Sequence, residues 1–220
     1  MTTLETLTPA EAAQAVPVHP DRPLLIVDVD EVLAHFMQGF GAFVARHGFE
    51  MRIDRFALFQ NIYRAGEDDC IDMPTGKRLF DDFFEHGADD LRPVDGAAAA
   101  LARLAEQMSV VILTNAPDHG RNARMGWLET HGLRYPMIIN SGLKGPVVRD
   151  LAARTGGTVG FIDDLLPNLE SVAEDAPDVI RFQMIADDRL RPYAPIAPDR
   201  HLWADDWAAM EPLIEQRLLG

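Results

Sequence analysis

The chain has 220 residues, 47% hydrophobic and 25% charged, which is typical of a globular protein and excludes a disordered or fibrous one. Asp and Glu total 35 against 20 Lys and Arg, so the net charge of -15 disfavours binding to nucleic acid polymers and to anionic membranes. A single cysteine allows no internal disulfide, no apolar run could span a bilayer, and the acidic opening residues are unlike a secretory signal. We therefore expect a cytoplasmic protein, either a monomer or a homodimer.

The first third of the chain predicts one strand followed by an insertion. Thr8 and Glu11 form a capping-box pattern for a short N-terminal helix, and the apolar run that follows the linker 17–23 predicts a strand over 24–29. Three Phe-rich segments follow, which we expect to be helices interrupted by Gly and by residues 73–76: 36–49, 54–66 and 77–87. We expect these segments to form a small helical cap domain at 34–92, with 1–33 and 93–220 as the core.

The rest of the chain alternates regularly between helices and apolar strands. The predicted helices lie near 95–107, 118–131, 146–155 and 166–175, with a closing helix at about 205–219. The predicted strands lie at 109–114, 136–139, 158–162 and 178–182. Continuous apolar strands separated by helices predict an α/β fold, a doubly wound parallel sheet covered on both faces. A strand order of 3-2-1-4-5 would make the first and fourth strands neighbours.

Pairs of carboxylates follow two of these strands. Asp28 and Asp30 stand where the first strand ends, and Asp163 and Asp164 follow the fourth. Burial of unpaired carboxylates is unfavourable, so a cation is expected beside them. Because ligands of open α/β sheets bind at the carboxyl ends of the strands, Asp28, Asp30 and Asp163 are expected to converge on one oxygen-rich site suited to Mg²⁺.

Two further residues predict an anion site at the end of the second strand, and a third residue is unusually placed. Thr114 and Asn115 end the second strand, just before a helix that starts with Pro117. Such residues most often act as helix caps, so this signal is weak alone. Lys144 precedes another Pro-started helix, where the helix dipole disfavours a cation, and this misplacement hints at function.

The motifs DxD, Thr, Lys and DDxxxN, in this order over residues 24–183, resemble the haloacid dehalogenase (HAD) superfamily. The resemblance is to its magnesium-dependent phosphohydrolases with a helical cap between the first and second motifs, and it implies a Rossmann-like core. It implies that Asp28 is a nucleophile that forms an aspartyl-phosphate and that Asp30 is the general acid/base. It also implies that the Asp28 carboxylate, the Asp30 carbonyl, Asp163 and Asp164 hold Mg²⁺.

The resemblance assigns the phosphoryl oxygens to Thr114, Asn115 and Lys144, and implies a phosphatase of a small phosphomonoester. Asp30 disfavours carbon–halogen cleavage, since the dehalogenases of the superfamily lack this residue. Residues 28–40 are loosely similar to deoxyribonucleotidases, so a nucleotide is one candidate substrate. A phosphomutase and a catalytically idle phosphate- or metal-binding protein remain alternatives. We also expect Arg64, Lys77 or Arg78 of the cap to contact an anionic substrate.

Overall fold

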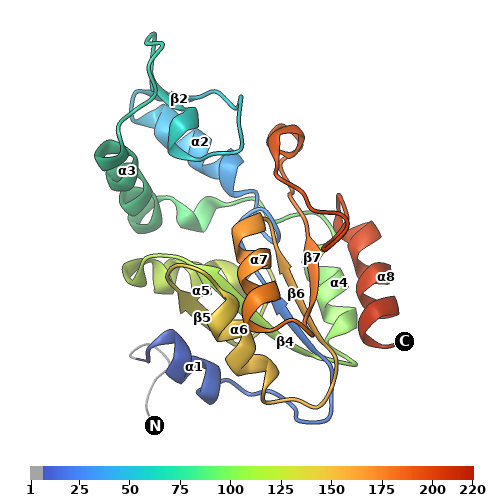
Figure 1. Cartoon of the computed structure of the whole chain (residues 1–220). Helices are drawn as coiled ribbons and strands as arrows, with labels where there is room; N and C mark the ends of the chain where they lie inside the picture. Colours follow the sequence, from blue (N-terminus) through green and yellow to red (C-terminus); the bar gives the residue numbers. More distant parts are fainter. Residues whose placement is uncertain (1–6) are drawn as a thin grey trace.

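The computed structural model describes residues 7–220, so part of the opening segment used to judge a secretory signal lies outside the described residues. Its centre is a six-stranded parallel sheet with the order β5-β4-β1-β6-β7-β8 (Figure 1). The strands are β1 (Leu24–Val27), β4 (Ser109–Asn115), β5 (Met137–Asn140), β6 (Val159–Asp163), β7 (Ile180–Gln183) and β8 (Leu202–Trp203). The α/β doubly wound prediction and the order 3-2-1-4-5 are confirmed, and β8 is an additional edge strand.

Helices cover both faces of the sheet because the strand residues alternate between two apolar clusters. In β1, Leu24 and Ile26 pack into one cluster, whereas Leu25 and Val27 pack into the other. The first cluster is covered by α1 (Pro9–Ala15), α6 (Gly145–Ala152) and α7 (Leu166–Asp175). The second is covered by α4 (Ala97–Leu104), α5 (Arg121–Thr130) and α8 (Trp207–Leu218). This double coverage leaves the carboxyl edge of the sheet as the place for a site.

The segment 34–92, here called the cap segment, lies over that carboxyl edge (Figure 1). It contains α2 (Phe36–Arg46), β2 (Phe49–Met51), the 3-10 turn η2 (Phe59–Asn61), β3 (Ile62–Arg64), α3 (Met73–His86) and the 3-10 turn η3 (Ala88–Asp90). Its buried Phe side chains belong to the same apolar cluster as α4, α5 and α8. The cap segment therefore packs directly on the core.

Two local predictions in the cap segment are wrong. Residues 54–66 are not a helix: β3 pairs antiparallel with β2, and the buried Asn61 amide donates to the carbonyls of Arg55 and Ala57, which holds a loop. Residues 73–76 do not interrupt a helix but open α3. The Asp72 carboxylate accepts the Thr75 N–H at 2.8 Å as its N-cap, and a proline is tolerated in a first turn.

The closing elements complete the core. After β7 the chain forms the 3-10 turn η5 (Arg191–Tyr193), β8 and α8, which continues through Pro212. The Trp207 indole N–H donates to the Val32 carbonyl at 2.9 Å and so ties α8 to the loop that follows β1. Within residues 7–220, no helix has both the length and the apolar character needed to cross a membrane.

Candidate active site

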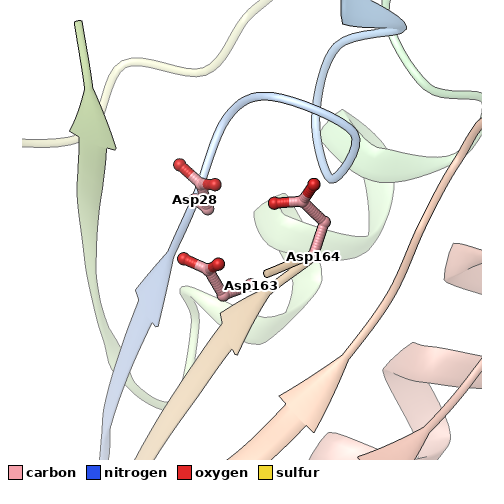
Figure 2. A group of neighbouring side chains, drawn as sticks. All are labelled: Asp28, Asp163 and Asp164. Carbon is pink, nitrogen blue, oxygen red and sulfur yellow. The ribbon is translucent and has the colours of Figure 1, made fainter. Parts of the chain in front are cut away.

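Three buried carboxylates meet at the carboxyl ends of β1 and β6. Asp28 follows β1, Asp163 ends β6 and Asp164 comes next, and one oxygen of each lies within 4.8 Å of the others. Figure 2 shows the three side chains gathered around one space. They meet because β1 and β6 pair in parallel, with Val27 beside Ile162. Of the three carboxylates expected to converge, Asp28 and Asp163 do so and Asp164 joins them, whereas the Asp30 side chain pairs with Arg124 instead.

Lys144 neutralises part of this charge. Its ammonium, 1% exposed, lies 2.7 Å from Asp28 Oδ1 and 2.7 Å from Asp163 Oδ2. The other oxygen of Asp163 accepts the Asn168 amide at 2.9 Å and the Leu165 N–H at 2.9 Å. Asp163 is therefore fixed from both sides, and three carboxylates share one ammonium.

The pKa shifts reflect this excess of buried negative charge. Burial raises the pKa of Asp28 to about 7; the Lys144 ammonium opposes the rise, and the Asp163 and Asp30 carboxylates add to it. Burial also raises the pKa of Asp164 well above its usual range, with the Asp163 charge as the next cause. Burial alone would lower the pKa of Lys144, but the Asp163 and Asp28 carboxylates raise it overall. Without a cation, the cluster holds protons that carboxylates in water release.

This donor set fits a divalent cation. Hard cations such as Mg²⁺ take carboxylate oxygens, and an ion of charge +2 would balance the two negative charges left by three carboxylates and one ammonium. The close spacing of the three oxygens and the raised pKa of Asp28 both point to a group that binds there in place of protons.

Asp30 faces a different partner. Its carboxylate oxygens accept hydrogen bonds from Nη2 of Arg124 on α5, at 2.8 and 2.9 Å. The Asp30 side chain is 21% exposed, and Asp30 lines the same cavity as Asp28. The side chain of Asp30 is therefore held outside the Asp28, Asp163 and Asp164 cluster.

Several hydrogen bonds hold the loop after β1. The N–H groups of Leu33 and Ala34 both donate to the Val29 carbonyl, at 2.8 and 2.9 Å, and close a tight turn. Glu31 has a φ of 60°, a left-handed conformation that is uncommon for a residue with a side chain. Its buried carboxylate accepts the N–H of Met37 and of Asp187, each at 2.7 Å. Burial raises the pKa of Glu31 to about 7 against the effect of these two bonds.

Of the three predicted phosphate-binding residues, Asn115 and Lys144 line the same cavity as Asp28, whereas Thr114 lies within β4 and does not line it. The Thr114 hydroxyl is buried and has no hydrogen-bond partner within residues 7–220. The Asn115 side chain donates to the Gly142 carbonyl at 2.9 Å and accepts from Asn140 at 2.9 Å. Asn115 thus supports the loop before Lys144 through its side chain. Asn140, a polar residue at the end of an apolar strand, was missed although it carries the same signal as Asp28.

A cavity of about 520 Å³ separates the cap segment from this edge of the sheet. The core contributes polar residues to its lining, among them Asp28, Asp30, Asn115, Lys144 and Asp164. The cap segment contributes apolar ones: Phe36, Met37, Phe56, Ala57, Leu58 and Phe80. A cavity of this size with a few polar groups is typical of a small-molecule site.

The expectation that a cationic side chain of the cap contacts the substrate is not supported, because none of the three candidates lines the cavity. Arg78 donates to the Thr75 hydroxyl of its own helix at 3.0 Å. The Arg64 guanidinium lies over the Phe49 ring, 5.3 Å from its centroid, and Lys77 is exposed. The cation that does face the cavity is Lys144 of the core.

Comparison with known proteins agrees with this geometry. The profile of the family described as 5′ nucleotidase, deoxy (pyrimidine), cytosolic type C protein (NT5C) matches residues 22–157, more than half of the chain. The matched region contains Asp28, Asp30, Thr114, Asn115 and Lys144 and ends before Asp163. No curated protein matches the chain in sequence.

Several solved structures share the fold. A haloacid dehalogenase-like hydrolase from Burkholderia xenovorans is 16% identical with a TM-score of 0.55, over 91% of this chain and 100% of the other. The HAD-hydrolase YfnB from Bacillus subtilis, bound to magnesium, is 16% identical with a TM-score of 0.59, over 89% and 99%. The D,D-heptose 1,7-bisphosphate phosphatase of B. bronchiseptica, complexed with magnesium and phosphate, is 15% identical with a TM-score of 0.50, over 88% and 98%.

Sequence profile, sheet order and site geometry thus agree with the resemblance drawn from the motifs. The chain is a hydrolase of the haloacid dehalogenase superfamily and belongs to its NT5C 5′-nucleotidase family.

Proposed function

We propose that the protein is a Mg²⁺-dependent phosphatase of nucleoside 5′-monophosphates that works in the cytoplasm through an aspartyl-phosphate on Asp28. The observation that carries this proposal is the cavity, which is lined both by Asp28 with Lys144 and by the rings of Phe36, Phe56 and Phe80. One part of the lining suits a phosphate and the other suits a flat, partly apolar ring system.

In the first step, a carboxylate oxygen of Asp28 attacks phosphorus and the bond between phosphorus and the 5′ oxygen breaks. Asp30 gives its proton to that oxygen, so the nucleoside leaves as an alcohol. Lys144 lies 2.7 Å from Asp28 Oδ1, where its charge can hold the nucleophile and stabilise the phosphoryl oxygens. Thr114, whose buried hydroxyl has no hydrogen-bond partner within residues 7–220, is proposed as a further phosphoryl ligand.

In the second step, water attacks phosphorus of the aspartyl-phosphate. Asp30, now a carboxylate, takes a proton from that water, the bond between phosphorus and Asp28 breaks, and phosphate leaves. Mg²⁺ held by Asp28, the Asp30 carbonyl, Asp163 and Asp164 would supply positive charge that lets the phosphate dianion and the nucleophile approach. The apolar side chains of the cap segment that line the cavity would limit the access of other water molecules during these steps.

The family and the lining of the cap segment both support a nucleotide substrate. The family description names pyrimidine deoxynucleotides, and we propose that these compounds are substrates of this chain. Phe36 and Phe80 come from α2 and α3, with ring centroids 6.1 Å apart, and both line the cavity. Aromatic side chains of this kind bind bases by stacking.

The experiment measures phosphate release from pyrimidine and purine nucleoside 5′-monophosphates, deoxy and ribo, a sugar phosphate and p-nitrophenyl phosphate, with Mg²⁺ or EDTA. Asp28→Asn tests the nucleophile. Asp178→Asn, at an exposed carboxylate outside the cavity, is the matched control.

We expect Mg²⁺-dependent release, fastest from a nucleotide, that is retained in Asp178→Asn and lost in Asp28→Asn. A faster reaction with the sugar phosphate would contradict the nucleotide assignment. Binding of Mg²⁺ without turnover of any compound would favour a mutase or an idle binding protein.

A further inference from the structure

Arg124 is a buried cation that the proposed reaction does not yet use. It lies on α5, and its side chain is 1% exposed. A single nitrogen, Nη2, donates to both oxygens of Asp30. Its other two nitrogens, Nε and Nη1, are buried and have no hydrogen-bond partner within residues 7–220. A buried guanidinium with two unused donors is unfavourable for folding, so its presence calls for a reason other than stability.

The rest of the guanidinium is packed by the cap segment. The Phe84 ring of α3 faces it, with 5.1 Å between Cζ of Arg124 and the ring centroid. Phe84 also contacts the core at Gly120, where an added Cβ would lie 2.7 Å from its Cδ1. The His119 ring lies 3.3 Å from the Asp81 carbonyl nearby. Arg124 therefore lies at the contact between cap and core, with Asp30 on one side and Phe84 on the other.

We propose that Arg124 is a positioning residue for Asp30: it holds the acid/base carboxylate in the orientation needed for proton transfer, and it does so while α3 covers the site. The inference rests on the proposed function, because it needs Asp30 to move protons. Asp30 follows β1 in a loop, and the sole side-chain hydrogen bonds of its carboxylate within the described chain are the two from Arg124. Without them, the carboxylate would sample several rotamers, of which few reach the 5′ oxygen.

Substrates with different leaving groups can distinguish a positioning role of Arg124 from a general disturbance of the active site. A nucleoside 5′ alcohol leaves slowly without a proton from Asp30, whereas p-nitrophenol leaves readily as the anion. The ratio kcat/KM covers the chemistry up to release of the alcohol, and kcat also covers hydrolysis of the aspartyl-phosphate. A misplaced Asp30 therefore lowers kcat/KM for the nucleotide, spares kcat/KM for the aryl phosphate, and lowers kcat for both.

The experiment compares thymidine 5′-monophosphate and p-nitrophenyl phosphate in the wild type, Arg124→Met, Arg124→Lys and Asp30→Asn, with Mg²⁺. Arg121→Met is the matched control, since Arg121 lies one turn away on α5 and is near Asp118 instead of Asp30. Thermal unfolding of each variant shows that it is folded, and rapid mixing with the aryl phosphate shows whether nitrophenol is released in a burst.

For Arg124→Met we expect kcat/KM for the nucleotide to fall about tenfold to 100-fold, while that for the aryl phosphate changes less than about twofold. A nitrophenol burst should appear because the aspartyl-phosphate accumulates. Asp30→Asn should show the same pattern more strongly, and Arg124→Lys, which keeps one cationic donor, should recover part of the loss. Arg121→Met should leave the ratio of the two substrates unchanged.

Equal losses on both substrates, or no loss on the nucleotide, would overturn the role of Arg124 while leaving the phosphatase intact. The same selective loss in Arg121→Met would also overturn it, since any change in α5 would then suffice. A wild-type protein without Asp28-dependent turnover of either substrate would refute the proposed function, and the inference with it.

Discussion

Replacing Asp28 by Asn should stabilise the metal-free protein, and more so as the pH rises. Burial raises the pKa of Asp28 from its ordinary value of 3.8 to about 7, so the folded chain keeps this proton to a higher pH than the unfolded chain. Between these two values the unfolded state binds fewer protons, and stability falls as pH rises. A shift of about three units, at roughly 1.4 kcal/mol each, corresponds to a loss of about 4 kcal/mol above pH 7.

Asn is neutral at every pH, so Asp28→Asn does not incur this loss. At pH 5 the wild type has lost only about 1 to 2 kcal/mol, because the folded carboxyl is still protonated. The advantage of the variant should therefore grow by about 2 to 3 kcal/mol between pH 5 and pH 8, which is roughly 5 to 10 °C in Tm for a chain of this size.

The assay is thermal unfolding in EDTA from pH 5 to pH 8, with Asp178→Asn as a control that should follow the wild type. Mg²⁺ at pH 8 should raise the Tm of the wild type much more than that of Asp28→Asn, because the ion replaces the missing proton. A difference in Tm between Asp28→Asn and wild type that stays constant from pH 5 to pH 8 would refute the account of the cluster as an excess of buried negative charge.

Three other substitutions test the surroundings of the site. Lys144→Met leaves two buried carboxylates without their ammonium, so we expect a loss of about 3 to 5 kcal/mol at pH 8 by urea unfolding, recovered in part by Mg²⁺. Glu31→Gln sets an amide donor against a backbone N–H and should destabilise the fold by about 1 to 3 kcal/mol in the same assay; an unchanged midpoint would contradict this. Gly120→Ala places a Cβ 2.7 Å from the Phe84 ring, so kcat/KM for a nucleotide should fall severalfold with a stability loss of about 1 to 3 kcal/mol, and unchanged kinetics would show that the contact does not matter.

Five of the six strands of the core sheet were predictable because each contains a short apolar run. The site was predictable for a related reason: a charged residue just after such a run has to lie at the edge of the sheet. Asp28 and Asp163 satisfy that rule, and the parallel pairing of β1 with β6 brings them together. β8 has two residues, too few for a recognisable hydrophobic pattern, and it is a strand because it pairs with β7 at the edge of the sheet.

The cap segment was harder to predict, because its apolar residues are compatible with both helices and strands. By composition, Phe49 and Ile62 would fit either a helix or a strand. The hairpin forms because β2 pairs with β3 and because the buried Asn61 amide holds the loop between them. The cationic residues of the cap looked like substrate ligands because the chain is so acidic. In the structure Arg64 instead packs on the Phe49 ring, and Arg78 donates a hydrogen bond to Thr75.

The burial of Arg124 could not be predicted from the sequence. Half of the residues of the helix RNARMGWLET are polar, so an arginine there predicts a solvated surface. The chain separation of 94 residues from Asp30 gives no local clue. Its burial results from two tertiary contacts at once: α3 covers it with Phe84, and the loop after β1 presents Asp30. A signal visible in sequence arises when one element alone determines a residue's environment, as the end of a strand does for Asp28. Arg124 depends on three elements, and for that reason its proposed role as the positioning partner of Asp30 emerged only from the folded arrangement.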